Sequence, residues 1–274
     1  MYKFLKIENN PRITHLYSGF TAVREAGYHY PGESHDFWEL VCVIDGKLQA
    51  TAGDRVFLLE KGQAILHSPM QFHTINCSQG TDAEIIIFSF KGYNIPQLQD
   101  NVCNINDINA VKELFARAQN AFCFDDIYFA CVKENENTAL KFVKRLEQFL
   151  LKLTDNLVDP NVLTTQGARN YNTIIQKLNE NIDKRLSVKE IAEACNMSAV
   201  GVQKTFSRFA GIGVMEYFNR LKVVKAKELL AEGSSVKEVA LKMGFYDPNY
   251  FSTVFKRIEG TTPESFKVYT KEDK

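Results

Sequence analysis

The side chains best suited to chemistry in the N-terminal part are histidines and carboxylates that stand close together. All five histidines fall within the first 73 residues. Glu33, His35 and Glu39 lie within one short segment, and His73 stands four positions after Pro69. Imidazole and carboxylate groups can hold a metal ion where three or four of them converge. They can also bind a polar organic molecule or support a core; the sequence favours the organic ligand and leaves the other two possibilities open.

Patterns typical of other protein classes are missing from the sequence. It has no Walker loop, no GxGxxG run and no Ser/His/Asp set. The six cysteines form no Cys-x-x-Cys pair, which is typical of reduced thiols in a cytoplasmic protein. No apolar run approaches the roughly 18 residues of a membrane span, and the first residues do not resemble a signal peptide. We therefore expect a cytoplasmic protein without enzyme activity, membrane contact or resident cofactor.

A second group of candidate residues lies in an internal repeat of the C-terminal part. The run Ser-Val-Lys-Glu-Ile-Ala at 187–192 recurs 48 positions later as Ser-Val-Lys-Glu-Val-Ala at 235–240. Each copy opens with Ser-x-x-Glu, the capping box that starts a helix. A break follows, and Ser198 or Asp247 can cap a second helix. Each copy therefore predicts a helix-turn-helix unit.

The second helix of each copy has one apolar face and one polar face at about 100° per residue. The outward residues carry donors suited to base edges and phosphates. In the first copy they are Val200, Gln203, Lys204, Ser207 and Arg208, and in the second they are Asn249, Ser252, Thr253 and Lys256. An ordinary helical bundle is the alternative, but two copies are too few for a solenoid. The helix expected at 214–231 would be roughly 27 Å long, close to the roughly 34 Å between successive major grooves.

The charge is distributed unevenly, although the whole chain has a formal net charge of zero. Residues 1–169 hold 16 basic and 20 acidic side chains, whereas residues 170–274 hold 17 and 13. This modest asymmetry directs a polyanionic partner such as double-stranded DNA to the C-terminal part.

The N-terminal part has the pattern of a small β domain followed by helices. Short apolar runs at 37–44, 47–52, 56–60, 63–67 and 84–90 alternate with turn signals, which predicts a barrel or sandwich. The pattern becomes helical from about Ile108, and apolar residues recur at three-to-four spacing through Thr138–Leu153. We expect this helix to form the seam of a homodimer, with packing on its own barrel as the alternative.

The repeat resembles the DNA-binding region of the AraC family of bacterial regulators over about Leu186–Phe266. The first copy carries its Ala-x-x-x-x-x-Ser signature as Ala192 to Ser198. The second copy is more distinctive, with Gly244-Phe245-Tyr246-Asp247, Asn249-Tyr250-Phe251-Ser252, Phe255-Lys256 and Gly260-Thr261-Thr262-Pro263. The resemblance implies that the outward positions of both second helices read DNA. Thr253 stands where the family often has Arg, which implies weaker base reading by the second copy, and Val214 replaces the usual Pro.

The N-terminal part loosely resembles a cupin over about Gly27–Phe90. Glu33, His35, Glu39 and Gly46 match the first cupin motif with one His replaced by Glu, and Pro69 to His73 matches the second. Regulators with such domains use them to bind small effectors, a sugar being one example, and usually lack the metal. We accordingly expect an effector to contact His35, Trp38, Glu39 and His73, and no metal to be bound.

These observations predict an α+β chain with three segments. Residues 1–155 form a cupin-like barrel with helices from about 108, for effector binding and dimerisation; 156–170 form a linker; and 171–274 form a double helix-turn-helix domain. The predicted function is an effector-responsive, sequence-specific transcription regulator that acts as a homodimer, with RNA polymerase as a further candidate partner. The alternative is a metal-dependent cupin enzyme fused to a DNA-binding tail, which metal analysis would distinguish.

Overall fold

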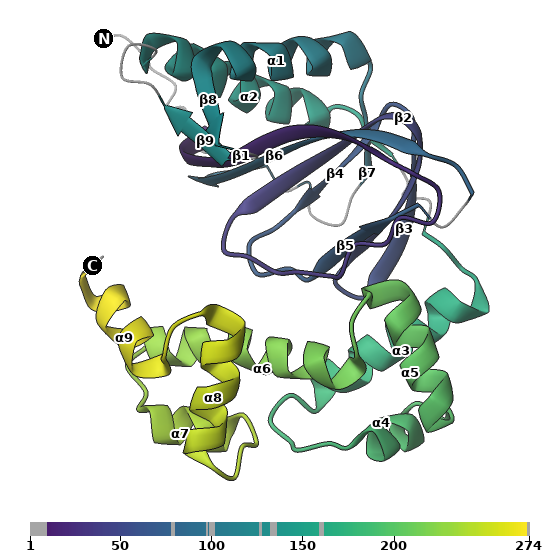
Figure 1. The fold of residues 1–274 in the computed structure, drawn as a ribbon, viewed down its shortest axis with the longest axis vertical. Helices are drawn as coiled ribbons and strands as arrows, with labels where there is room; N and C mark the ends of the chain where they lie inside the picture. Colours follow the sequence, from purple (N-terminus) through teal and green to yellow (C-terminus); the bar gives the residue numbers. More distant parts are fainter. Residues whose placement is uncertain are drawn as a thin grey trace, which may run out of the picture. The chain divides into compact units, whose positions relative to one another are not determined.

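The chain divides into two compact units, unit 1 at Met1–Leu163 and unit 2 at Thr164–Lys274 (Figure 1). The computed structural model describes residues 10–77, 80–96, 98, 102–125, 128–131, 136–158 and 162–272. Over these residues unit 1 combines an antiparallel sheet with two helices, and unit 2 is helical. The predicted α+β class, with β structure first and paired helix-turn-helix units last, is confirmed.

Unit 1 is built on one antiparallel sheet in which β2 is shared by two layers. The strands are β1 (Arg12–Arg24), β2 (Trp38–Ala52), β3 (Arg55–Glu60), β4 (Gln63–His67), β5 (His73–Asn76), β6 (Ala83–Tyr93), β7 (Val102–Asn104), β8 (Phe122–Asp125), β9 (Tyr128–Cys131) and β10 (Leu157–Val158). The first part of β2 pairs with β4 and β6, and its last part pairs with β3 and β5. The change of partners follows an irregularity in register between Val43 and Asp45. Gly46 stands at this bend with φ 78°, where a Cβ would lie 1.8 Å from the Asp82 carbonyl oxygen.

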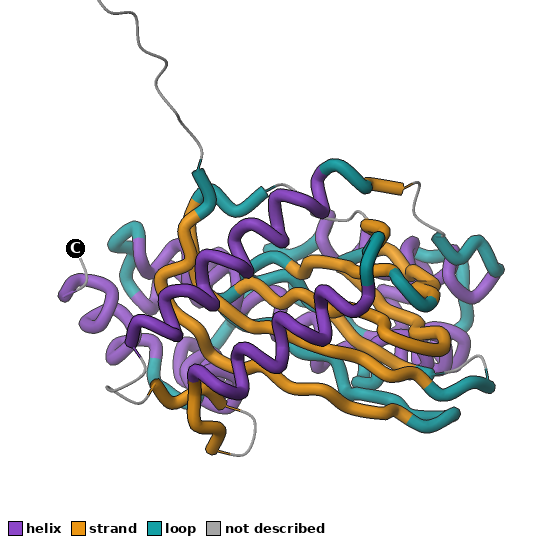
Figure 2. Tube along the Cα trace, turned by 90° about the horizontal axis from the view of Figure 1, so that it is seen from above, coloured by secondary structure: helices purple, strands orange, loops and turns teal. Residues whose placement is uncertain are grey.

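The two faces of this sheet bury two different apolar clusters. One face packs against α1 (Ile108–Ala121) and α2 (Glu136–Thr154), which lie side by side across the strands in Figure 2. The other face encloses a cluster shared by both parts of β2, by β3 and by β6. Residues of β2 are buried on both sides for this reason, and alternate positions of β2 therefore enter different environments.

The apolar stripe of the 138–153 helix is buried inside unit 1, on α2. Phe142, Leu146, Leu150 and Leu153 are at most 2% exposed and pack with the sheet and α1. The Phe142 ring centroid lies 5.9 Å from that of Phe88 on β6. The prediction that this stripe forms a dimer seam is therefore wrong, because the barrel of its own chain already covers it. A charged residue at Leu146 would disrupt this core and would not test dimerisation.

Unit 2 contains seven helices within its described range, 164–272. They are α3 (Gln166–Glu180), α4 (Val188–Ala194), α5 (Ala199–Ala210), α6 (Val214–Ala231), α7 (Val236–Lys242), α8 (Pro248–Glu259) and α9 (Pro263–Glu272). Both capping boxes form, with Ser187 and Glu190 starting α4 and Ser235 and Glu238 starting α7. The caps explain why these short helices begin where they do, since each box satisfies free N–H groups. Helices α4 and α5 form the first helix-turn-helix unit, and α7 and α8 form the second.

The segment predicted as a linker, 156–170, contains more regular structure than expected. Leu157–Val158 pairs with β7, and Val162 bridges to Phe57. Helix α3 begins at Gln166, with the Thr165 hydroxyl accepting from the first turn. Residues 159–161 of the predicted linker lie outside the described residues. Thr165 is thus a helix cap and not part of a loop, and a fragment that contains all of α3 must start by residue 164.

Across the described residues, no helix combines the length and the apolar character that crossing a membrane requires.

Candidate nucleic-acid interface and ligand pocket

Helix α5 exposes the whole face predicted to contact DNA. The Ser198 hydroxyl accepts from the Gly201 N–H at 3.0 Å, and Gly211 ends the helix in the left-handed conformation. The opposite face is buried through Val202 and Phe206. The exposed residues are Val200, Gln203, Lys204, Ser207 and Arg208. An amide and two cations on successive turns can contact base edges and phosphates in a major groove.

Helix α8 exposes a smaller and less basic face. Asn249, Thr253 and Lys256 are exposed, and Ser252 is half-buried. The hydroxyls of Ser252 and Thr253 donate to the carbonyl oxygens of Pro248 and Asn249, at 2.9 and 3.0 Å. Both hydroxyl hydrogens are therefore used inside the helix, so towards a base these two side chains offer acceptor oxygens and the Thr253 methyl group, and the Asn249 amide is the donor.

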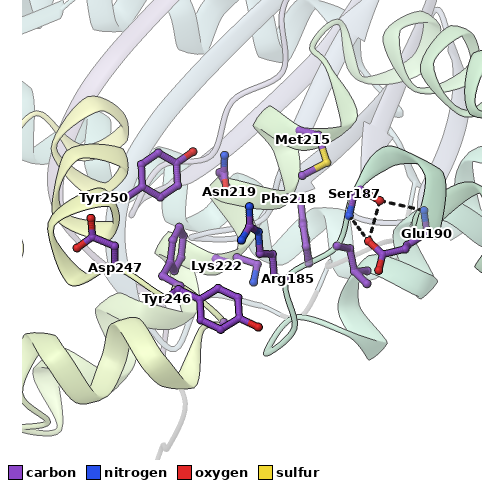
Figure 3. A pocket seen from close by; sticks show the side chains of 13 residues that line it. Arg185, Ser187, Glu190, Met215, Phe218, Asn219, Lys222, Tyr246, Asp247 and Tyr250 are labelled. Carbon is purple, nitrogen blue, oxygen red and sulfur yellow. Dashed lines mark hydrogen bonds between the residues drawn. The ribbon is translucent and has the colours of Figure 1, made fainter.

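A hollow of about 770 Å³ lies between the two helix-turn-helix units (Figure 3). Its wall includes Arg185 before α4, Lys222 on α6, and Tyr246 and Tyr250 around the start of α8. Tyr246 is 81% exposed and Tyr250 is 56% exposed, and the Arg185 guanidinium carbon lies 5.6 Å from the Tyr246 ring centroid. Sequence reasoning missed this group, although two tyrosines flanking the cap Asp247 were a signal. The guanidinium and the phenols add hydrogen-bond donors beside α8 that suit phosphate oxygens.

Lys222, which lines this hollow, joins the two helix-turn-helix units of unit 2, and sequence reasoning missed it as well. Its side chain is 3% exposed. Nζ donates to the Lys184 carbonyl oxygen at 2.6 Å and also to the Met243 carbonyl oxygen, which closes α7. Nζ lies 4.6 Å from the Phe218 ring centroid. Burial lowers the pKa of Lys222 to about 8. The Lys222 ammonium group therefore bonds one carbonyl oxygen just before α4 and one at the end of α7, where the two helix-turn-helix units meet.

We expect Lys222→Met to lower the free energy of unfolding of unit 2 by about 1–3 kcal/mol, because two buried carbonyls lose a charged donor. Urea unfolding of residues 164–274, followed by circular dichroism, measures the change. Lys225→Met is the matched control, since Lys225 lies on the same helix with its side chain 49% exposed and paired with Glu228. Equal stability of the two variants would contradict the role given to Lys222.

Four acidic and histidine side chains from the cupin-like motifs come together in unit 1. Glu33 and His35 come from the segment between β1 and β2, Glu39 from β2, and His73 from the start of β5. Their ligand atoms all lie within 4.8 Å of one another. Nε2 of His73 is 3.3 Å from Oε1 of Glu39, and Nε2 of His35 is 3.7 Å from Oε2 of Glu39. Four groups separated by up to 40 residues thus converge on one point.

Burial and mutual contact shape the ionisation of this cluster. Burial by itself would raise the pKa of Glu39, but the imidazoles of His35 and His73 hold this pKa well below its usual range. Burial would lower the pKa of His73, but the Glu39 carboxylate raises it above its ordinary value. His67, stacked on His73 with ring centroids 4.3 Å apart, has a pKa lowered well below the usual value, mainly by burial.

Trp38 does not join the cluster, in contrast to the prediction. It precedes Glu39 on β2 and packs against the apolar cluster on the helix-covered face, whereas Glu39 points to the barrel interior. The period of two along a strand places these adjacent residues on opposite faces of the sheet. Instead, His67 stacks on His73, and Ser89 donates to Glu39 Oε2 at 3.4 Å. Both lie opposite Glu39 in the register of neighbouring strands.

Two family models match the chain, one in each unit. The AraC-like ligand binding domain matches residues 16–106, and a helix-turn-helix domain matches residues 184–268. The first range contains the whole Glu33–His73 cluster, and the second contains both repeat copies. The chain belongs to the AraC family. Within this AraC-family chain the helix-turn-helix match begins at residue 184, after the end of α3 at Glu180.

Curated relatives agree with this placement. AdaA of Bacillus subtilis, a bifunctional transcriptional activator and DNA repair enzyme, is 28% identical over 99 residues, which are 36% of this chain and 47% of AdaA. The match thus spans about half the length of AdaA. The transcriptional activator RhaS of Escherichia fergusonii is 23% identical over 255 residues, or 87% of each chain. Among solved structures, apo ToxT of Vibrio cholerae covers 92% of this chain and 97% of its own, at 14% identity and a TM-score of 0.37. That score is too low to add to the assignment.

Proposed function

We propose that this AraC-family chain is a sequence-specific transcription regulator. In this proposal α5 and α8 bind double-stranded DNA, and a small ligand held by His35, Glu39 and His73 controls the activity. The observation that supports it best is the exposed polar face on the second helix of each repeat copy. Helix α6, with 18 residues, separates the copies by roughly 27 Å, which suits adjacent major grooves.

We expect Gln203→Ala and Lys204→Ala to change which bases are preferred, whereas Lys256→Ala weakens binding to all sequences alike. Gln203 and Lys204 lie near the middle of the exposed α5 face, where a lost base contact costs about 1–3 kcal/mol at one position of the site. Lys256 lies in the last turn of α8, where a phosphate is the expected partner. Selection from a randomised operator library, followed by sequencing of the bound DNA, gives the preference of each variant.

Lys177→Ala is the control for this experiment, because Lys177 lies on α3 and pairs with Glu180 at 2.7 Å. It should leave both preference and affinity unchanged. Uniform losses across the library for the two α5 variants would contradict base reading by α5, and an altered preference for Lys256→Ala would contradict its assignment to phosphate.

We further propose that the full-length chain is a homodimer and that RNA polymerase is a partner at the promoter. The stripe on α2 is buried, so the dimer needs another surface. Leu140 and Leu151, 57% and 43% exposed on the same helix, are the candidate contact residues.

A further inference from the structure

We infer that Glu33, His35, Glu39 and His73 form a site for one divalent first-row transition-metal ion, and that this ion is the ligand to which unit 1 responds. The inference rests on the proposed function for the responsive role, and on the geometry of the four side chains for the site itself. It differs from the expectation of an organic effector without a metal that the sequence favours.

The spacing of the ligand atoms fits one shared ion. Ligand atoms about 2.1 Å from a tetrahedral ion are about 3.4 Å from one another. Nε2 of His73 lies 3.3 Å from Glu39 Oε1 and 4.0 Å from Glu33 Oε1, and Nε2 of His35 lies 3.7 Å from Glu39 Oε2. All four ligand atoms lie within 4.8 Å of one another, so small side-chain movements would bring them to coordination distance of one ion.

Both histidines are oriented as metal ligands are. Nδ1 of His35 is 3.0 Å from the Phe37 carbonyl oxygen, and Nδ1 of His73 is 3.0 Å from the Gln71 carbonyl oxygen. A carbonyl only accepts, so each Nδ1 carries a proton, and Nε2 is the nitrogen left to bind a metal. Both Nε2 atoms are buried and face the Glu39 carboxylate at 3.7 and 3.3 Å, and among the described residues neither makes a hydrogen bond of good geometry. Histidines that bind metals use this arrangement, with the second nitrogen donating to a backbone carbonyl.

The surroundings support the two carboxylates and leave an entrance. His73 is 2% exposed and Glu39 is 8% exposed, whereas the Glu33 side chain is 39% exposed. The Tyr30 hydroxyl donates to Glu33 Oε2 at 3.0 Å, and the Ser89 hydroxyl donates to Glu39 Oε2 at 3.4 Å. Two carboxylates balance the charge of a divalent ion. Because Glu33 is partly exposed, an ion can reach the site from solvent on the side of Glu33.

The donor set decides the class of metal. Two imidazoles and two carboxylates, with no thiolate, suit Zn²⁺, Fe²⁺, Mn²⁺, Co²⁺ or Ni²⁺ better than Cu⁺, which prefers sulfur, or Ca²⁺ and Mg²⁺, which prefer oxygen alone. Coordination would also tie the segment that carries Glu33 and His35 to β2 and β5, so that binding is expected to stabilise unit 1.

Titration of the full-length, untagged chain with Co²⁺ after removal of metals by a chelator tests the site. We expect one equivalent to bind, with visible absorption bands of coordinated Co²⁺ and a raised melting temperature, and Zn²⁺ to displace it. Glu33→Gln and His35→Gln should each weaken binding at least about tenfold, since even outer-shell changes cost 10–100-fold. His15→Gln is the matched control, because His15 is exposed and bonds only locally to Thr14 among the described residues.

Folded protein that takes up well below one equivalent of both Co²⁺ and Zn²⁺ would overturn the site. Binding that Glu33→Gln and His35→Gln leave unchanged would overturn it too, because the ion would then lie elsewhere. Glu33 is partly exposed, so its variant should fold even where a change at buried His73 does not. DNA binding by the metal-loaded and metal-free chain separates the two proposals: no binding in either state contradicts the regulator, and one-equivalent uptake with identical DNA affinity contradicts the responsive role of the ion alone.

Discussion

Binding of unit 2 to double-stranded DNA is expected to weaken about 100- to 2,000-fold when the salt concentration rises from 50 to 200 mM, for about four to six phosphate contacts. Residues 164–274 hold 18 basic and 13 acidic side chains. The exposed faces of α5 and α8 supply Lys204, Arg208, Lys256 and Arg257. Each neutralised phosphate releases bound counterions, so the affinity falls as a power of the salt concentration.

The contributions of individual basic side chains to DNA binding can be separated by how steeply the affinity depends on the salt concentration. A plot of log affinity against log salt should lose about one unit of slope for Lys256→Gln, because Lys256 is the residue assigned to a phosphate. Arg257 should matter less, because it already pairs with Glu216 at 2.9 Å. Fluorescence anisotropy of labelled duplex DNA with residues 164–274 measures the slopes at several salt concentrations.

Two controls distinguish phosphate contacts by α5 and α8 from a general effect of charge. Lys177→Gln, on α3, should keep the full slope, and residues 1–163, with 15 basic and 20 acidic side chains, should not bind DNA at low salt. A slope near zero for unit 2 would contradict binding through the phosphates. An equal loss of slope for Lys177→Gln would mean that net charge, and not the faces of α5 and α8, determines the affinity.

Local signals made the helix-turn-helix units predictable from the sequence. Ser187 with Glu190, and Ser235 with Glu238, are capping boxes whose partners stand three residues apart, so a short window contains the whole interaction. The exposed and buried faces of α5 also follow from helical period alone. The resemblance to the AraC family reinforced this interpretation because its motif residues coincide with these caps and turns.

Contacts between distant segments were not predictable in the same way. The period of α2 indicates that one face is covered, but the choice between a second chain and its own sheet depends on strands far away, as the contact between Phe88 and Phe142 illustrates. In the sequence Lys222 is one lysine among several on α6, and only its contact with Lys184, 38 positions earlier, reveals its role. The cupin-like motif suggested that Glu33 and His73 lie close together. The face of the sheet on which Trp38 lies depends on the register of the strands, which the motif does not give.

Gly244→Ala is expected to destabilise unit 2 more than other glycine substitutions in left-handed turns. Gly244 has φ 72°, and an added Cβ would lie 2.6 Å from the Asp183 carbonyl oxygen and 2.8 Å from the Lys184 carbonyl carbon. These are backbone atoms, so no side-chain rotation relieves the contact. The left-handed conformation costs an alanine about 1–2 kcal/mol, and overpacking against a fixed neighbour adds about 1–3 kcal/mol.

The contact matters because it lies at the junction of the two helix-turn-helix units. The 183–185 segment precedes α4, Gly244 follows α7, and Lys222 donates to carbonyl oxygens on both sides of this contact. Gly260→Ala is the matched control, since Gly260 has φ 75° with no atom within 4 Å of an added Cβ. Urea unfolding of residues 164–274 should show that the free energy of unfolding falls by about 1–2 kcal/mol for Gly260→Ala and by about 2–5 kcal/mol for Gly244→Ala.

Where both variants remain folded, Gly244→Ala should also bind DNA more weakly, because displacing the 183–185 segment changes the spacing of α5 and α8. Equal losses of stability in the two variants would show that the chain relaxes around the methyl group and that the junction is not rigid.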